Sequence, residues 1–230
     1  MAGFRPYCET LVCIYTCEAH RGILREFHLS PLGRFLKQWK GAQIIEVYAD
    51  DSLYRPHASS RRVILNCRED YTQLSFKTLL MMRYCVKQFK FTRLLKIDVT
   101  TVMTDLSAPE YAGRKPLSQP ALIAFLRDAD TATDYNGFIC HTSADRNGAE
   151  SWAAKKGLCI DYESLFGDSC MPAFYSGKCY FVGIHFAKYI AIHGYDYAEE
   201  HSRLLAGAED VMVGRLFREF QCRTSSRENS

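Results

Sequence analysis

The sequence predicts an α/β fold in which a mostly parallel mixed central sheet is covered by helices on both faces. Apolar runs of strand length recur along the chain, at residues 11–16, 44–48, 63–65, 94–97, 137–141 and 179–183. Segments with helical spacing separate several of these runs, and this alternation is typical of sheets whose parallel strands are joined by helices. Such sheets hold their ligands beyond the carboxyl ends of the strands.

Two segments carry apolar residues at steps of three and four, the spacing of one helix face. The first follows Pro31 and contains Leu32, Phe35, Leu36 and Trp39. The second is longer and contains Tyr71, Leu74, Thr78, Met82, Cys85 and Phe89. We expect both helices to pack on the sheet.

The length and composition favour one domain. The chain has 230 residues, of which 47% are hydrophobic, and this is enough to bury one sizeable core. We expect a single domain over residues 1–222. The polar residues 223–230 are expected to form a disordered tail.

Charge and hydropathy exclude two classes of partner. The 29 basic and 26 acidic residues leave a net charge of +3, which is too small to predict a nucleic-acid-binding surface. No apolar run approaches the roughly 20 residues of a membrane-spanning helix. The ten cysteines are dispersed through predicted strands and helices, so we expect most of them to be reduced and buried.

Acidic residues occur where predicted strands or loops open onto a ligand. They are Asp50-Asp51 after 44–48, Asp98 after 94–97, and Glu209-Asp210 before the last predicted helix. Asp50-Asp51 would also suit a turn, and Glu209-Asp210 would suit a helix start, where the helix dipole favours acids. Asp98 is harder to explain structurally, because it ends an apolar strand at the ligand-binding edge.

Four blocks in the same order resemble the β-1,3-galactosyltransferase and Fringe group of glycosyltransferases, which have the GT-A nucleotide-binding fold. They are Glu69 to Leu79, Leu95 to Asp98, Pro172 to Val182, and Glu209 to Gly214. The resemblance covers roughly residues 10–220. It implies a GT-A-like fold and transfer of a sugar from a nucleotide donor to a glycan or glycoconjugate.

The resemblance also implies a role for each matching position. Asp210 is the expected general base, which removes a proton from the acceptor hydroxyl as it attacks the anomeric carbon. Glu209 is expected beside it as a helper or acceptor contact, and a single in-line displacement would invert the anomeric centre. The expected donor contacts are Lys77, Arg21 and Arg25 to phosphate, Thr16, Asp50 and Asp51 to the nucleoside, and Trp152 to the sugar.

Several of these positions have an alternative interpretation. Lys77 would also suit a solvated helix edge, and Arg21 and Arg25 would suit ordinary surface positions. Trp152 would serve equally as an apolar anchor for its loop.

The metal motif of this group is incomplete here. The family places acids at both ends of the motif, whereas the sequence reads Asp98-Val99-Thr100. Asp98 could still hold Mg²⁺ or Mn²⁺ together with water and diphosphate oxygens. Alternatively, Arg or Lys side chains neutralise the diphosphate without a metal. Uridine diphosphate is the usual nucleotide of the family.

Two other functions are compatible with parts of the sequence. A degenerate member of the fold would bind a carbohydrate without turnover, as the missing acid at Thr100 suggests. A sugar nucleotidyltransferase would need a glycine-rich phosphate loop, and residues 16–21 contain no glycine. The lack of an apolar anchor leads us to expect a cytoplasmic bacterial or viral enzyme, unless an anchor precedes this sequence.

Overall fold

A seven-stranded mixed sheet forms the centre of the protein, in the order β3-β4-β2-β1-β5-β9-β6. The computed structural model describes residues 7–100, 102–103, 118–130, 132–141, 173–200 and 208–228. The strands of the sheet are β1 (Tyr7–Tyr15), β2 (Ala42–Ala49), β3 (His57–Ser59), β4 (Arg62–Leu65), β5 (Lys90–Asp98), β6 (Tyr135–Gly137) and β9 (Cys179–Gly183). A second, two-stranded sheet pairs β7 (Cys140–His141) with β8 (Phe174–Tyr175).

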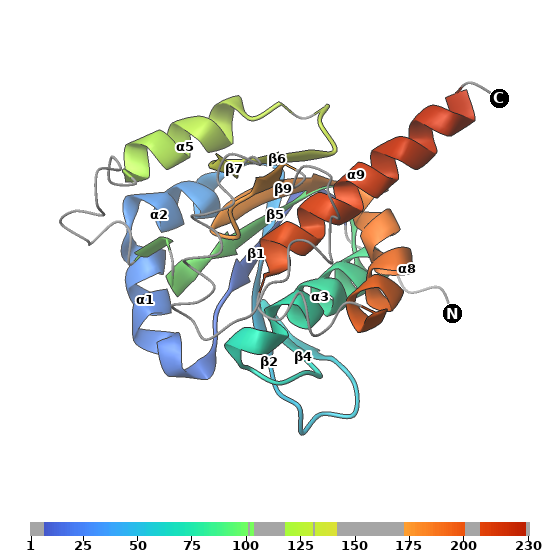
Figure 1. The fold of residues 1–230 in the computed structure, drawn as a ribbon. Helices are drawn as coiled ribbons and strands as arrows, with labels where there is room; N and C mark the ends of the chain where they lie inside the picture. Colours follow the sequence, from blue (N-terminus) through green and yellow to red (C-terminus); the bar gives the residue numbers. More distant parts are fainter. Residues whose placement is uncertain are drawn as a thin grey trace.

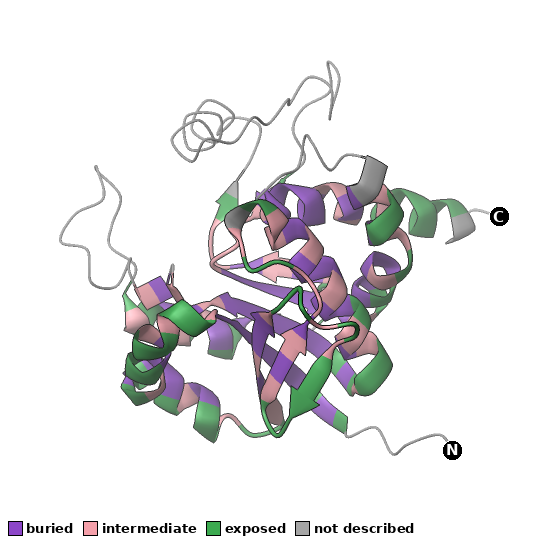
Figure 2. Ribbon diagram, turned by 90° about the horizontal axis from the view of Figure 1, so that it is seen from below, coloured by how far each residue is buried: buried purple, intermediate pink, exposed green. Residues whose placement is uncertain are grey.

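Helices cover both faces of the large sheet (Figure 1). They are α1 (Arg21–Leu29), α2 (Pro31–Gln38), α3 (Leu74–Gln88), α5 (Gln119–Asp128), α8 (Ile184–Glu200) and α9 (Glu209–Glu228), with short 3-10 turns at Glu18–His20 and Tyr71–Gln73. Helices α1, α2 and α5 lie on one side of the sheet, and α3, α8 and α9 lie on the other. Figure 2 shows that the strands between these layers are mostly buried.

Strand alternation divides the core into two layers, because successive side chains point to opposite faces of a sheet. Leu11 and Cys13 of β1 pack in the layer formed with α3, α8 and α9. Val12 and Ile14 pack in the layer formed with α1, α2 and α5. The single apolar run of β1 therefore serves both cores.

Strand direction places the ends of the central strands at one edge of the sheet. Strand β1 runs parallel to β2 and to β5, and β2 runs parallel to β4. Strands β3 and β9 run antiparallel to β4 and β5, and β6 runs antiparallel to β9. The predicted α/β class with a mostly parallel mixed sheet and helices on both faces is confirmed.

Local sequence explains where two helices begin. The hydroxyl of Ser30 accepts a hydrogen bond from the backbone N–H of Gly33, and Pro31 occupies the first turn of α2. Ser118 caps α5 in the same way by accepting from Ala121. Side-chain caps of this kind satisfy N–H groups that the first helical turn leaves without partners.

Two boundaries differ from the sequence expectation. The apolar run at 137–141 is divided between β6 and β7, which belong to different sheets. Helix α9 continues to Glu228, which corrects the prediction of a disordered tail over 223–230 as far as that residue. The hydroxyls of Thr224 and Ser226 donate to carbonyls of the preceding turn, at Phe220 and Cys222. These bonds let polar residues lie within a helix.

Two further sequence expectations concern the membrane and the cysteines. Among the described residues, no helix has both the length and the apolar character needed to span a bilayer. The described part of the chain contains eight cysteines, and all of them are free thiols. Four of these are buried, at Cys8, Cys13, Cys85 and Cys179.

Candidate active site

The candidate site lies at the edge where β1, β2 and β5 end. Asp98 is the last residue of β5, and Tyr15 at the end of β1 pairs with it in register. Thr16 follows β1 and donates its backbone N–H to the carbonyl of Val47 at 3.1 Å. The strand order therefore brings two predicted site residues, Thr16 and Asp98, to neighbouring positions on this edge.

Asp98 is joined to the turn before β9. Its backbone N–H donates to the carbonyl of Lys178 at 2.9 Å. The pairing of Ile97 with Cys179 in the antiparallel β5–β9 ladder fixes this contact. The Asp98 side chain is half-buried, so it remains accessible from the edge of the sheet.

Asp210 lies beside the same turn. Its Oδ2 accepts from the backbone N–H of Gly177 at 3.2 Å, and its Oδ1 accepts from the N–H of Val211 at 3.0 Å. Gly177 precedes Lys178, the partner of Asp98. Asp98 and Asp210, far apart in the sequence, thus contact adjacent residues of one turn.

The environment of Asp210 raises the pKa of its carboxyl to about 6. Burial is the main cause, because removing a carboxylate from water disfavours its charged form. The negative charge of neighbouring Glu209 adds to the effect, while the N–H groups of Gly177 and Val211 and the cation of Lys96 oppose it. Asp210 is half-buried at the start of α9, where it can still meet a substrate.

Glu209 has a different environment, although it is the next residue. It is only 3% exposed and forms an ion pair with Lys96. The hydroxyls of Thr78 and Tyr180 donate to its Oε2 at 2.6 and 3.1 Å. The Glu209 carboxylate therefore points into the protein and is engaged there by three donors. Of its two expected roles, this arrangement favours the helper beside Asp210 over the acceptor contact.

Buried hydroxyl groups extend this internal network. The hydroxyls of Tyr15 and Thr78 are 2.9 Å apart. Burial raises the pKa of Tyr15 and of Tyr180 well above the usual value, and the charge of Glu209 adds to both shifts. Both phenols therefore remain protonated and serve as hydrogen-bond donors.

Lys77 is also an internal residue. Its Nζ donates to the carbonyl of Thr16 at 2.9 Å and to the two carboxylate oxygens of Glu69 at 2.6 and 2.8 Å. An ammonium group has three hydrogens, and all three have acceptors here. This arrangement differs from the predicted phosphate contact. Glu69 also accepts from the backbone N–H of Ala49 at 2.7 Å, so the pair ties α3 to the ends of β1 and β2.

The Thr16 side chain has an unmet hydrogen-bonding capacity. Its Oγ1 is buried and has no hydrogen-bond partner within the described parts of the chain. A buried hydroxyl without a partner costs about 1–3 kcal/mol. A ligand at this edge that supplies a donor or acceptor would remove that cost.

The other expected nucleoside contacts are on the surface. Asp50 and Asp51 are exposed. Oδ1 of Asp50 accepts from the backbone N–H and the hydroxyl of Ser52 at 2.9 and 2.6 Å, and these bonds lower the pKa of Asp50. These bonds agree with the alternative interpretation of Asp50-Asp51 as a turn.

The two predicted arginines lie near the start of α1. Arg21 is exposed and forms an ion pair with Glu18 at 2.5 Å. Glu18 also pairs with Arg62, whose guanidinium lies 4.1 Å from the centre of the Tyr48 ring. Arg25 is exposed on α1. Trp152 lies outside the described residues.

Thr100, which stands where the family's metal motif has its second acid, contacts a histidine. The hydroxyl of Thr100, which replaces the second acid, lies 3.0 Å from Nδ1 of His20. The Sγ of Cys17 also lies 3.0 Å from this nitrogen. No three His, Cys, Asp or Glu side chains of the described residues group closely enough to hold a metal ion. Asp98 is a half-buried carboxylate at this edge, of a type that can bind a divalent cation.

Lys96, Thr78, Tyr180 and His20 lie at the site, although no sequence motif marked them as site residues. Lys96 lies within an apolar strand, and Thr78 lies within the apolar stripe of α3. One signal for Lys96 was present in the sequence, since it is a lysine inside an apolar run that predicts a buried strand. A fully buried lysine is rare unless it is paired.

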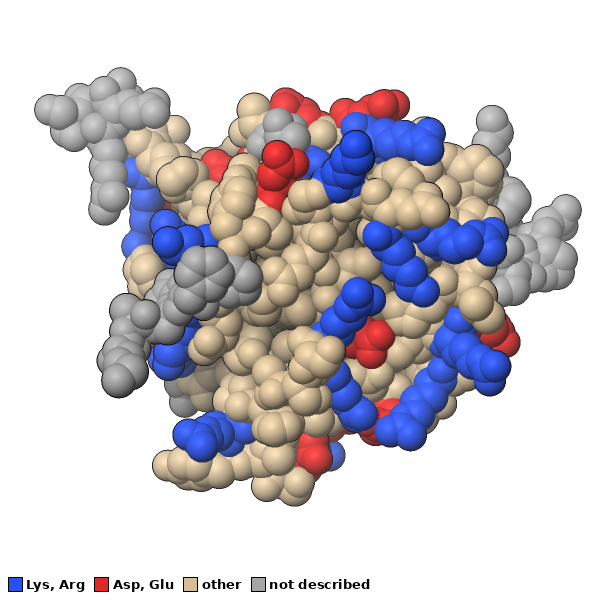
Figure 3. Space-filling model, turned by 180° about the vertical axis from the view of Figure 1, so that it is seen from behind, with Lys and Arg blue, Asp and Glu red and all other residues tan. Residues whose placement is uncertain are grey.

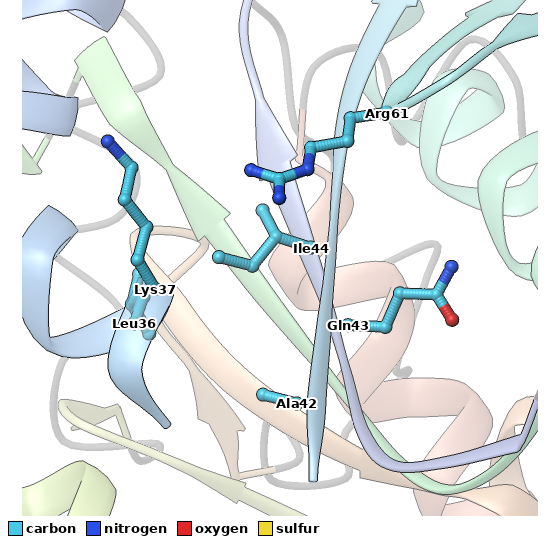
Figure 4. Close-up of a pocket in the computed structure, with 6 residues that line it drawn as sticks. All are labelled: Leu36, Lys37, Ala42, Gln43, Ile44 and Arg61. Carbon is cyan, nitrogen blue, oxygen red and sulfur yellow. The ribbon is translucent and has the colours of Figure 1, made fainter. Parts of the chain in front are cut away.

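A separate cavity lies away from this edge (Figure 4). It has a volume of about 220 Å³ and is lined by Leu36, Lys37, Ala42, Gln43, Ile44 and Arg61. Ala42 pairs with Thr10 toward the amino end of β1, whereas the candidate site lies at the carboxyl end. Figure 3 shows basic side chains spread over the face behind that of Figure 1, with acidic ones between them.

The fold and the site together define the class of protein. A mixed seven-stranded sheet between two helical layers, with acidic side chains at the carboxyl edge, is a GT-A-like fold. The galactosyltransferase family profile matches residues 60–228, so the chain belongs to the galactosyltransferase family. It is therefore a glycosyltransferase. A comparison with curated proteins gives no significant sequence match.

Proposed function

We propose that the protein is an inverting glycosyltransferase that moves a sugar from a nucleoside diphosphate donor to a hydroxyl of a glycan or glycoconjugate, with Asp210 as the general base. The observation that carries the proposal is the position of Asp210. It is half-buried at the carboxyl edge of the sheet, beside the turn that also contacts Asp98. Its raised pKa of about 6 suits a base that works near neutral pH.

The proposed reaction is one in-line displacement. Asp210 takes the proton of the acceptor hydroxyl as the hydroxyl oxygen forms a bond to the anomeric carbon. The bond between this carbon and the diphosphate oxygen breaks at the same time, and its electron pair leaves with the diphosphate. Attack opposite the leaving group inverts the anomeric configuration.

The nucleoside is proposed to bind near the end of β1. The buried hydroxyl of Thr16 has no hydrogen-bond partner among the residues that the structure describes, and this favours a polar ligand at this point. A UDP-sugar is the proposed donor, since uridine diphosphate is the usual nucleotide in enzymes of the β-1,3-galactosyltransferase group.

Asp98 is the proposed contact to a divalent cation. Mg²⁺ is often bound through one or two carboxylates, with substrate phosphates and water as its other ligands, so a single half-buried carboxylate fits such an ion. When bound, the ion would stabilise negative charge on the diphosphate.

In a metal-independent reaction the positive charges of the exposed Arg21 and Arg25 would stabilise the diphosphate instead. A chelator added during turnover separates the two: loss of activity that Mg²⁺ or Mn²⁺ restores supports the ion, and unchanged activity supports the arginines.

A panel of nucleotide sugars tests the proposal. The purified protein is incubated with each donor, with and without simple glycan acceptors, and release of the nucleoside diphosphate is measured. We expect slow hydrolysis of one donor without an acceptor and faster release with one. Donor binding without release from any member of the panel would contradict the proposal and favour a carbohydrate-binding role.

A further inference from the structure

Lys96 is a buried cation inside the sheet. It lies on β5, two positions before Asp98, and its side chain is 2% exposed. Its Nζ forms an ion pair with Glu209, which is itself buried, and donates to the carbonyl of Gly177. The ammonium also lies 4.6 Å from the centre of the Tyr15 ring.

Fold stability alone gives a poor account of this pair. Removing two charges from water is unfavourable, and the attraction between them often does no more than offset that cost. Well-packed apolar side chains would commonly serve a core as well or better. The contacts around the pair are those of groups that fix the position of a neighbouring segment of the chain.

The turn at Gly177 connects this pair to Asp210. Lys96 holds the Gly177 carbonyl, and the N–H of the same glycine donates to Oδ2 of Asp210. Glu209, the other partner of Lys96, is the residue before Asp210 in the first turn of α9. Lys96 is thus connected to Asp210 by two routes. One passes through the turn at Gly177, and the other passes through Glu209 in α9.

The approach of these groups is close enough to require glycine in the turn. A Cβ atom at position 177 would lie 2.5 Å from Oε1 of Glu209 and 3.6 Å from Nζ of Lys96. The first distance is shorter than any van der Waals contact. The absence of a side chain at Gly177 therefore lets the turn, the ion pair and the start of α9 meet.

We infer that Lys96 is a positioning residue for Asp210, and that with Glu209 and Gly177 it holds the start of α9 against the strand that ends in Asp98. The inference rests on the proposed role of Asp210 as the base. It assigns Glu209 to the support of the site rather than to the acceptor. Since Asp98 is on the strand of Lys96, the same device fixes the base relative to the donor.

The double variant Lys96→Met/Glu209→Gln tests this inference. It removes both charges without leaving either one buried alone, and glutamine can still accept from Thr78 and Tyr180. We expect a folded protein, checked by thermal melting, whose kcat falls about 10- to 100-fold because small displacements of a catalytic group have effects of this size. The donor KM should change little, since the base acts in the chemical step.

Two more variants complete the test. Arg93→Met removes another buried cation of β5, which donates to the Thr10 hydroxyl and the Ala129 carbonyl, and it should lower stability without lowering kcat per folded molecule. Glu209→Gln alone replaces the double variant if that one does not fold, with the same expected fall in kcat.

The outcomes separate this inference from the proposed function. Wild-type kcat in the folded double variant, or in Glu209→Gln, overturns the positioning role while leaving Asp210 as the base. Full activity in Asp210→Asn overturns the proposed base, whatever the Lys96 variants do.

Discussion

Asp210 accepts a hydrogen bond from the backbone N–H of Gly177 at 3.2 Å. Lys178 follows Gly177 in the chain, and its carbonyl accepts a hydrogen bond from the backbone N–H of Asp98 at 2.9 Å. A turn of the chain thereby joins an acid at the end of β5 to an acid at the start of α9. This connection places Asp98 and Asp210 at the same edge of the sheet, although they are far apart in the sequence.

The first prediction concerns the space at Gly177. A Cβ there would lie 2.5 Å from a buried oxygen of Glu209, so Gly177→Ala should lower the free energy of unfolding by about 1–3 kcal/mol. Gly22→Ala, in α1, is a control, because no atom of the described residues lies within 4 Å of a Cβ at that position. Chemical denaturation measures both variants. Equal stability of the Gly177 variant and the wild type would refute the close approach.

The second prediction concerns stability and pH. Asp210 has a folded pKa of about 6, above its ordinary value of 3.8, so the folded state keeps this proton more readily than the unfolded state. Between these values the contribution of Asp210 to stability falls as pH rises. Asp210→Asn removes the titration and should therefore be more stable than the wild type above pH 6.

The expected gain is on the order of 1–2 kcal/mol, reduced from the full shift because the side chain is half-buried. It should disappear below about pH 4, where the wild-type carboxyl is protonated in both states. Melting curves over a pH series measure it. A gain that is the same at every pH would show that the titration of Asp210 is not its cause.

The third prediction separates two roles for Lys77. Because its ammonium is held by Glu69 and the carbonyl of Thr16, Lys77→Met should lower stability by about 1–3 kcal/mol. It should also weaken donor binding by loosening the end of β1. A direct phosphate contact would instead raise the donor KM with no loss of stability. Glu69→Gln is the companion variant and should show a smaller loss, since Glu69 is partly exposed.

Sequence reasoning was most successful where burial dictated the pattern. Five of the six apolar runs fall on single strands of the large sheet, because buried strands need continuous apolar residues. It failed at 137–141, where one run serves β6 and β7 in different sheets. Composition alone does not show where a chain leaves one sheet for another.

The candidate site was only partly predictable, for a geometric reason. Glu209 and Asp210 are equally acidic neighbours, but successive helical residues point in directions about 100° apart. One therefore enters the core and the other faces the edge. The sequence likewise could not show that Lys77 has three internal acceptors, because those come from Thr16 and Glu69 after folding.

The fourth prediction concerns Asp98. Its carboxylate lies at the edge where the donor is proposed to bind, so Asp98→Ala should raise the donor KM about tenfold or lower turnover by a similar factor. Asp130→Ala is the control, since Asp130 is exposed and accepts from the backbone N–H of Ala132, and no role in the site is proposed for it. Initial rates over a range of donor concentrations measure both. An Asp98 variant with wild-type kinetics would remove it from the site.

The central claim is that Asp210 is the base, and the turnover of Asp210→Asn tests it most directly. An amide cannot take the acceptor proton, so kcat should fall about 10²- to 10⁴-fold while donor binding stays close to that of the wild type. Glu219→Gln, on the same helix, should keep wild-type kcat. Full transfer activity in a folded Asp210→Asn variant would contradict the account.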